Sequence, residues 1–290
     1  MLIATHNGKF HADDVFGVAL LLLLFPEARL IRTRDGAKLA EADIVLDVGA
    51  VYDPASRRFD HHQKGAPKRS NDITYSAFGL LWKEYGLQYC DGNKELWRRI
   101  DEKLIQYIDA RDNGNEVYVL NEKNVTPFTI SDNVSLFNPL TNSTEDFDSQ
   151  FMKAVERATT DLDRLKAVIQ DQLTNETYFE QQYAQSSDKR FAVLDKYLDI
   201  VGIAERHPEL LFVVFPEEAN AQWMLHTVRV KPSEFKTRKP LPEAWQSLQN
   251  EELAEVTGVV DAVFCHAGRF VAAARSKEGT MRLLELALGE

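Results

Sequence analysis

The first third of the chain alternates short apolar runs with stretches of helical periodicity. Apolar runs at residues 2–5 and 29–33 predict short strands, and the periodic stretch at residues 14–25 between them predicts a helix that ends at Pro26. A third strand is expected at residues 43–48, with its last polar residue at the carboxyl end, where open parallel sheets bind ligands. This order of elements is typical of an α/β domain, a mostly parallel sheet flanked by helices.

Helical periodicity dominates the middle of the chain, and strands return near its end. After a hairpin at residues 52–60, helices are expected at residues 75–85, 94–110 and 151–183, with a polar surface loop at 138–149. Beyond residue 186 the pattern predicts four strands and a closing helix, at residues 211–215, 223–230, 262–265, 270–274 and 280–288. We therefore expect two domains, residues 1–185 and a smaller α+β domain at 186–290, facing each other across a cleft.

The composition is that of an ordinary globular protein: 290 residues, 44% hydrophobic and 27% charged. With 34 basic and 45 acidic residues the net charge is −11, so a polyanionic substrate would need basic residues gathered locally. Cys90 and Cys265 lie far apart, which excludes a disulfide framework and a paired-cysteine metal motif. The longest apolar run, residues 15–25, is shorter than the ~20 residues of a membrane span, and no signal peptide is visible. We expect a soluble, cytoplasmic protein with no membrane partner, and a homo-oligomer stays open.

Histidines and aspartates cluster near the amino end. Four of the seven histidines fall in two runs, THNGKFHADD and FDHHQ, within the first 62 residues. Imidazole and carboxylate together suit Mn²⁺, Zn²⁺, Fe²⁺ or Co²⁺, whereas an all-oxygen set suits Mg²⁺ or Ca²⁺. His6 follows the first strand, Asp47 ends another, and Asp60 to His62 end the hairpin, so these regions can converge on one sheet edge. A transition-metal site is therefore predicted there.

Each candidate also has a simpler interpretation. An isolated His or Asp is usually a cap, a turn residue or a solvated group, and Asp109 taken alone fits that description. Asp14 opens an apolar helix, and we assign it to the helix amino end rather than to a metal. Asp109 and Asp112 both lie where a helix runs into an Asn-Gly turn, and either could reach the site. For His61 and His62, preceded by Asp60, a ligand with its orienting partner is the better interpretation.

Taken together, these runs resemble a known superfamily. The DHH run at residues 60–62, the His-x-Asp at residues 11–13, Asp47 and a later acidic motif are similar to those of DHH phosphoesterases. More closely, THNGKFHADD, DVG, FDHHQ, DARDNG, RKPLPEAW and FCHAGRFVAAARSKEG resemble the melanocyte-proliferating-gene exonuclease family over nearly the whole chain. The resemblance implies a two-domain, DHH-like, metal-dependent phosphoesterase and, for eukaryotic members, a 3′-to-5′ exoribonuclease. Many superfamily members have an Asp-rich first motif, whereas this sequence has His6 and His11 there. This arrangement is closer to that of the manganese inorganic pyrophosphatases of the same superfamily.

The resemblance also implies a role for each candidate. It implies two divalent cations, the first on His6 and His11, the second on Asp13, His61 and Asp112 (with Asp109 as the alternative), and Asp47 bridging both. His62 would face the substrate and donate to a phosphate oxygen or the leaving group, and Asp60 would orient an imidazole. Mn²⁺ is the first expectation, with Mg²⁺, Co²⁺, Fe²⁺ or Zn²⁺ as alternatives.

Substrate contacts are expected from the second domain. The run from residue 229 to residue 239 holds five basic residues, of which Arg229, Lys231, Arg238 and Lys239 are the candidates for phosphate binding. Their alternative is a solvated basic edge. The HAGR run, with His266 and Arg269, resembles the substrate-binding loop of the second domain in DHH proteins. Trp223 and Trp245 would stack on a base or belong to the core.

Hydrolysis of phosphodiester bonds, with RNA as substrate and water activated by two cations, is the expected activity. The same ligands would serve a small-molecule phosphohydrolase acting on pyrophosphate or a nucleotide. They would also serve a metal-binding protein without activity. The sequence leaves these alternatives open.

Overall fold

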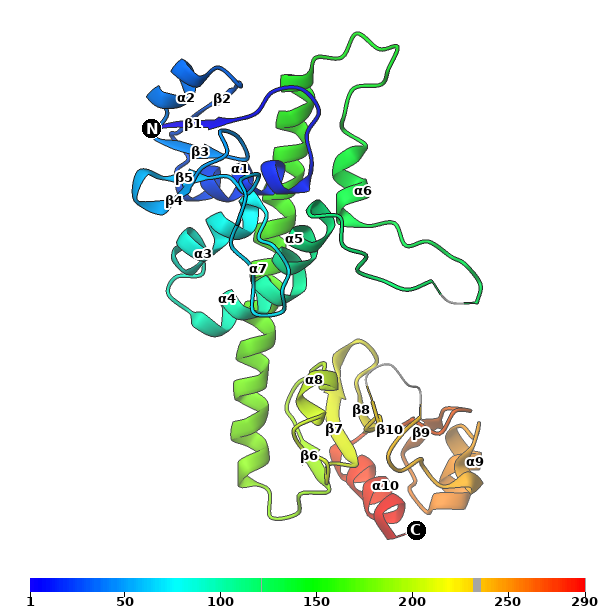
Figure 1. Ribbon diagram of the computed structural model, residues 1–290. Helices are drawn as coiled ribbons and strands as arrows, with labels where there is room; N and C mark the ends of the chain where they lie inside the picture. The colour runs from blue at the N-terminus through cyan, green and yellow to red at the C-terminus, as the bar shows by residue number, and fades with distance from the viewer. Residues whose placement is uncertain (121, 232–235, 290) are drawn as a thin grey trace. The chain divides into compact units, whose positions relative to one another are not determined.

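The computed structural model describes residues 1–120, 122–231 and 236–289, and it divides into two compact units, Met1–Asp171 and Gln172–Glu290. Both units combine a sheet with helices, which confirms the expected α/β class (Figure 1). Helix α7 (Phe147–Gln185) crosses the division, whereas the boundary predicted after residue 185 falls at its end. Within the described ranges, no helix has the length and apolarity needed to cross a membrane.

The sheet of the first unit has the strand order β2-β1-β3-β5-β4. Its strands are short: β1 (Leu2–Thr5), β2 (Arg29–Arg32), β3 (Ile44–Leu46), β4 (Tyr52–Asp53) and β5 (Arg58–Phe59). β1 pairs in parallel with β2 and β3, β3 pairs in parallel with β5, and β4 runs antiparallel to β5 in the predicted hairpin. The neighbouring strands β1, β3 and β5 therefore end at the same edge of the sheet.

The core of the first unit forms around α1 (Ala12–Leu24), which is buried from Ala12 to Leu21. A helix that is apolar on nearly all sides belongs inside a protein, and α1 packs against α3 (Ala77–Tyr89), α5 (Gln106–Asp112) and α6 (Ile130–Ser135). The helix predicted at residues 94–110 occurs as α4 (Lys94–Ile100), a turn of π-helix (η2, Asp101–Ile105) and α5. Helices α2 (Gly36–Glu41) and α6 were not predicted, because six residues are too few to show a helical period.

The sheet of the second unit has the order β6-β7-β8-β10-β9, with β6 parallel to β7 and the other neighbours antiparallel. Its elements are β6 (Phe191–Val193), α8 (Val201–Ala204), β7 (Phe212–Glu217), β8 (Gln222–Thr227), α9 (Asn250–Thr257), β9 (Ala262–Cys265), β10 (Val271–Ala274) and α10 (Lys277–Gly289). Short 3-10 turns lie at Pro54–Ser56, Glu218–Asn220 and Glu243–Trp245. Trp245 is buried in the core of this unit and Trp223 packs against that core, so both belong to the core.

Candidate metal centre

The carboxyl ends of β1, β3 and β5 bring three of the sequence motifs together. His6 follows β1, Asp47 follows β3, and the run from Asp60 to His62 follows β5. The amino end of α1 adds Asp13, preceded by its N-cap His11, and the last residue of α5 adds Asp112. Five separate segments of the first unit thus meet at one place.

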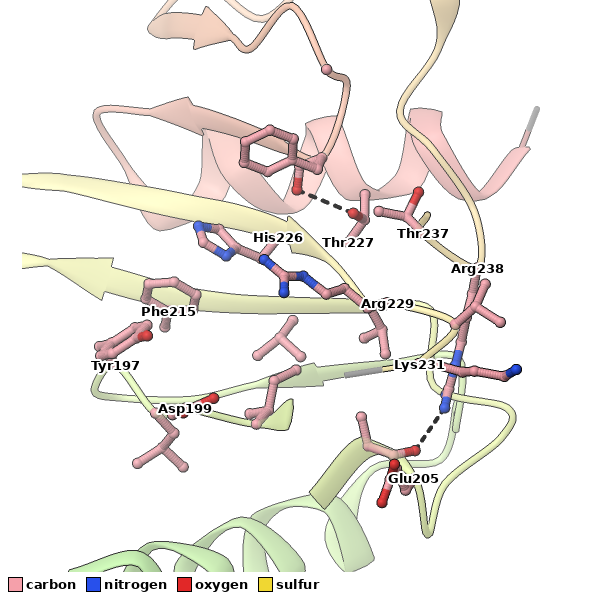
Figure 2. Close-up of a pocket in the computed structure, with 18 residues that line it drawn as sticks. Tyr197, Asp199, Glu205, Phe215, His226, Thr227, Arg229, Lys231, Thr237 and Arg238 are labelled. Atoms are coloured by element: carbon pink, nitrogen blue, oxygen red, sulfur yellow. Dashed lines mark hydrogen bonds between the residues drawn. The ribbon is translucent and has the colours of Figure 1, made fainter. Parts of the chain in front are cut away.

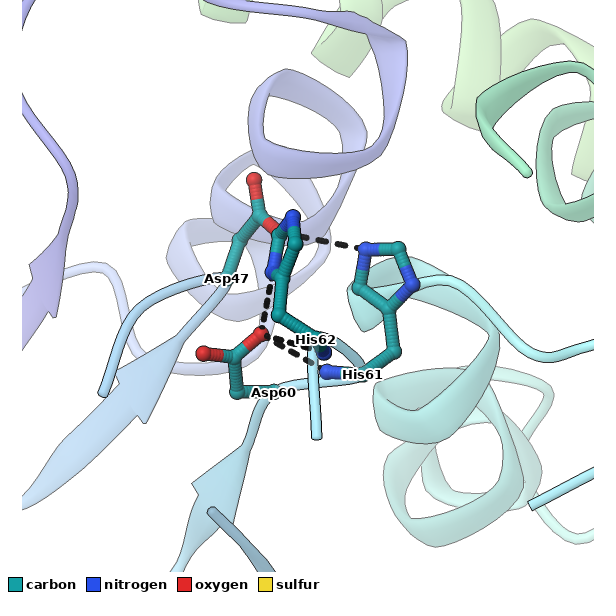
Figure 3. A group of neighbouring side chains, drawn as sticks. All are labelled: Asp47, Asp60, His61 and His62. Carbon is teal, nitrogen blue, oxygen red and sulfur yellow. Dashed lines mark hydrogen bonds and ion pairs between the residues drawn. The ribbon is translucent and has the colours of Figure 1, made fainter. Parts of the chain in front are cut away.

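Asp47 lies at the centre of this group. One of its carboxylate oxygens, Oδ2, is 3.2 Å from His6 Nε2, and the other, Oδ1, is 3.4 Å from His61 Nε2. His61 Nε2 also lies 3.1 Å from Asp112 Oδ2 and 3.8 Å from Asp13 Oδ2. His11, Asp13 and Asp112 offer ligand atoms that lie within 4.8 Å of one another, as do Asp47, Asp60, His61 and His62 (Figure 3). A carboxylate that faces two imidazoles in this way has the position required of a bridging ligand.

Asp47 is also strained, because its backbone φ of 54° lies in the left-handed region. A non-glycine residue held there costs on the order of 1 kcal/mol, and such residues concentrate at functional sites. Aspartate and asparagine tolerate this region better than most residues, so an Asn at position 47 can adopt the same backbone.

Asp14 was assigned to the helix amino end, and the structure shows that this is only half of its role. Its Oδ1 accepts a hydrogen bond of 2.9 Å from the backbone N of His11, as a capping residue does. Its other oxygen, Oδ2, lies 3.2 Å from His6 Nε2, and His6, Asp14 and Asp47 form a third group of ligand atoms within 4.8 Å. Asp14 therefore joins the candidate metal ligands.

Buried polar atoms without partners test whether these residues fit a cation. Of the twelve buried side-chain atoms without a hydrogen bond in the described part of the chain, five belong to this group: both carboxylate oxygens of Asp13, Asp14 Oδ2, Asp47 Oδ1 and His61 Nε2. Three of them lie 3.2–3.8 Å from imidazole nitrogens without forming a hydrogen bond. Leaving buried polar groups unsatisfied costs about 1–3 kcal/mol each, and divalent cations would satisfy all five at once. The mixed nitrogen and oxygen donors fit the expected transition metals.

The carboxylates and imidazoles of this group shift one another's pKa values. Burial alone would lower the pKa of His6, but its contacts with Asp14 and Asp47 outweigh burial and raise the pKa to about 10. The pKa of His61 is likewise raised to about 10, because Asp112 and Asp47 outweigh its burial. Burial and the neighbouring carboxylates Asp47 and Asp112 raise the pKa of Asp13 well above its usual value. Without a cation, protons therefore neutralise the site.

Asp60 and His62 form a pair beside this group. Asp60 is buried and accepts hydrogen bonds from the backbone N of Ala50 and His61, at 2.6 and 2.7 Å. Its Oδ1 lies 2.6 Å from His62 Nδ1, while the His62 side chain is 61% exposed (Figure 3). The carboxylate holds one ring nitrogen and leaves Nε2 for a substrate, as expected of an orienting partner.

Asp109, the alternative to Asp112, lies outside the three ligand groups. Its carboxylate accepts hydrogen bonds from Ser76 Oγ at 2.7 Å and from Arg69 Nε at 2.5 Å. Arg69 binds Asp101 as well, and a Cβ atom at Gly79 of α3 would overlap the Asp109 carboxylate. Asp109 thus belongs to a buried ion-pair network under the site, and Asp112 is the one that reaches His61.

Two hollows flank the metal centre, with volumes of about 660 and 560 Å³, and both are lined by His11, Asp47 and His62. The larger also contains Arg111, and the smaller contains Lys9 and Arg34. These three basic residues were not predicted. For Lys9 and Arg111 the signal was present, because each lies inside a quoted motif beside a candidate ligand.

In the second unit, two of the basic candidates donate hydrogen bonds to backbone carbonyls. Arg238 is structural, because its guanidinium donates to the backbone carbonyls of Ala204, His207 and Leu210 at 2.5–2.8 Å. Lys239 also donates to a carbonyl, that of Leu288, at 3.3 Å. Phosphate binding by these two residues stays a prediction.

Arg229, Lys231 and Arg238 line a cavity of about 530 Å³ with the rings of Phe215 and His226 (Figure 2). His226 sits 4.9 Å from Phe215, ring to ring, and burial lowers its pKa to about 4, so it is neutral at physiological pH. Of the HAGR run, His266 Nδ1 accepts a hydrogen bond of 2.9 Å from the backbone N of Gly268, and Arg269 has a φ of 54°. Both lie in the turn between β9 and β10.

Comparison with known proteins identifies the family. The model of the MYG1 exonuclease family, described as an uncharacterised protein family (UPF0160), matches residues 2–288. The chain belongs to this family. It is 31% identical to the human MYG1 exonuclease, over 99% of this chain and 86% of that protein. The MYG1 proteins of Dictyostelium discoideum and Chlamydia pneumoniae are also 31% identical, over 97% and 99% of this chain and 94% and 96% of theirs.

Membership of the MYG1 exonuclease family confirms the resemblance found in the sequence. The exonuclease name of the mammalian relatives agrees with the expectation of a hydrolase that acts on phosphodiester bonds. Among solved structures, a pGpG-specific phosphodiesterase, PggH from Vibrio cholerae, covers 99% of this chain and 98% of its own, with 14% identity and a TM-score of 0.34.

Proposed function

We propose that the protein is a divalent-metal-dependent phosphoesterase that hydrolyses phosphodiester bonds, and that its substrate is RNA, cleaved from the 3′ end. The observation that carries the proposal is the set of unpartnered buried atoms on Asp13, Asp14, Asp47 and His61. They lie at the carboxyl edge of a parallel sheet, beside two open hollows. The exonuclease name of relatives supports the choice of a nucleic acid as substrate.

The ligands divide around Asp47. His6 and His11 would hold one cation, and Asp14 is an additional candidate because it shares a group with His6 and Asp47. The second cation would lie among Asp13, His61 and Asp112, and Asp47 would contact both. When bound, the cations supply a water of lowered pKa as nucleophile and neutralise charge on the phosphoryl group.

His62 would act as the proton donor. Asp60 Oδ1 lies 2.6 Å from Nδ1 and orients the ring, so that Nε2 points away from Asp60 and is the nitrogen that would carry the donated proton. The exposed position of the ring lets this group reach the leaving oxygen of a phosphodiester bound over Asp47. Within the second unit, Arg229 and Lys231 would bind phosphate in the cavity that they line.

Hydrolysis tests with the Mn²⁺-loaded protein separate the candidate substrates. RNA and DNA oligonucleotides labelled at the 5′ end, bis(4-nitrophenyl) phosphate and inorganic pyrophosphate are compared, and the oligonucleotide products are resolved by length. We expect an RNA ladder that shortens one nucleotide at a time, and the Asp47→Asn protein as inactive control. Turnover of pyrophosphate alone would indicate a small-molecule phosphohydrolase, and bound metal without turnover would indicate a binding protein.

A further inference from the structure

The smaller hollow beside the candidate metal centre is lined both by candidate ligands and by two basic side chains. It is lined by His6, Asp47, Asp60 and His62 together with Lys9 and Arg34, and its volume is about 560 Å³. Lys9 lies between β1 and α1, and Arg34 follows β2, so both come from loops at the same sheet edge as His6. Both side chains are exposed.

Lys9 and Arg34 do not act as counter-ions of the aspartates nearby. Among the described residues, neither side chain makes a hydrogen bond or an ion pair, although Asp47 and Asp60 line the same hollow. Although the net charge of the protein is −11, these two basic side chains beside the candidate metal centre are therefore available to bind an anion. Lysine and arginine in such positions are typical ligands of phosphate groups.

The reacting group would lie between two hollows. The larger one, of about 660 Å³, shares His11, Asp47 and His62 with the smaller one and adds Arg111, Asn113 and Ser131. A phosphodiester has two substituents, and a phosphorus atom placed over Asp47 would direct one substituent into each hollow. The larger hollow, with an amide and a hydroxyl, suits a terminal nucleoside, and the smaller one suits the next phosphate of the chain.

We propose that Lys9 and Arg34 form a phosphate subsite that binds the internucleotide phosphate next to the one being cleaved. The inference rests on the proposed function and gives its substrate class: a chain of at least two phosphodiesters. A small diester has no second phosphate to place there. The two residues would therefore set the preference for oligonucleotides and would act through binding.

The test compares Lys9→Ala/Arg34→Ala with the wild-type protein and with Arg29→Ala/Lys38→Ala, a control that removes two exposed cations of the same unit outside both hollows. Equilibrium binding of a five-nucleotide RNA is measured by fluorescence anisotropy, with Ca²⁺ replacing Mn²⁺, over a salt series. Each phosphate neutralised on a single strand contributes about 0.7 to the slope of log affinity against log salt, so the loss of this one subsite should reduce the slope by about 0.7. The control should keep the wild-type slope.

Kinetics with Mn²⁺ complete the test. For the Lys9→Ala/Arg34→Ala protein, KM for RNA should rise ~10-fold while kcat/KM for bis(4-nitrophenyl) phosphate stays within about twofold of wild type. Equal losses of kcat/KM on both substrates would overturn the inference, because Lys9 and Arg34 would then act on the metal centre rather than on a second phosphate. An unchanged salt slope and KM for RNA would overturn it as well. If the wild-type protein cleaves no phosphodiester at all, the proposed function has failed, and the binding data still decide whether the subsite exists.

Discussion

Metal binding should expel protons from the site, and the structure gives their number. The pKa values of His6 and His61 are raised to about 10, so both rings are almost fully protonated at pH 7.5 in the metal-free protein. A ring must lose its proton to ligate a metal, so loading the site releases about two protons. Burial also raises the pKa values of Asp13 and Asp14, and any proton that these carboxyls hold would add to this number. With an ordinary pKa of 6.5, the two rings together would release only about 0.2.

Calorimetric titration of Mn²⁺ in buffers of different ionisation enthalpy measures this release. Because each cation displaces one imidazole proton, the apparent affinity for each cation should rise about 10-fold from pH 7 to pH 8, and the product of the two affinities about 100-fold. The Asp47→Asn protein is the internal comparison, since each imidazole loses one of its carboxylate partners and should hold its proton less firmly. A release near 0.2 protons at pH 7.5, with affinity almost independent of pH, would refute the coupling between the imidazoles and the aspartates.

Three further outcomes are expected. His62→Gln should lower kcat for RNA by about 10²–10⁴-fold, and far less for a nitrophenyl diester whose leaving group needs no proton, with Mn²⁺ content unchanged; equal losses would contradict a proton donor. Asp109→Asn should lower the free energy of unfolding by ~1–3 kcal/mol in urea titrations, because it disrupts the buried contacts with Arg69, whereas Asp112→Asn should instead weaken metal binding. The Tm of the metal-free protein should fall as pH rises from 6.5 to 10. The stability that protonated His6 and His61 contribute is complete below pH 6.5 and is lost as pH rises through their raised pKa of about 10. A Tm that rises over this range would contradict this contribution.

Local patterns were sufficient to predict the skeleton of the site. Short apolar runs placed β1 and β3, so His6 and Asp47 could be assigned to strand ends before any contact was known. Asp109 and Asp112 are three residues apart on one helix and share a face, so periodicity could not separate them. The two differ in burial, because Asp109 is buried and accepts hydrogen bonds from Ser76 and Arg69.

Other functional features depend on contacts between distant segments. Which oxygen of Asp14 caps α1 and which faces His6 is decided by the packing of α1 beside β1 and β3. Arg238 looked like part of a basic patch, but three carbonyls more than 25 residues away occupy its guanidinium. Arg34 carried no signal, because the sequence does not show that the end of β2 opens into the same hollow as His6.

The π-helical turn at Asp101–Ile105 makes this part of the chain sensitive to changes in length. An α-helix advances about 100° per residue, and a π-turn accommodates one additional residue, which rotates everything after it by that angle. Asp101, the first residue of the turn, and Asp109 after it both form ion pairs with Arg69, while Asp112, one turn further on, faces His61. Deleting a single residue here would leave the segment helical, but it would turn Asp109 away from Arg69 and Asp112 away from His61. Point substitutions along the exposed face of this helix should therefore be tolerated far better than any one-residue insertion or deletion between Ile100 and Gln106.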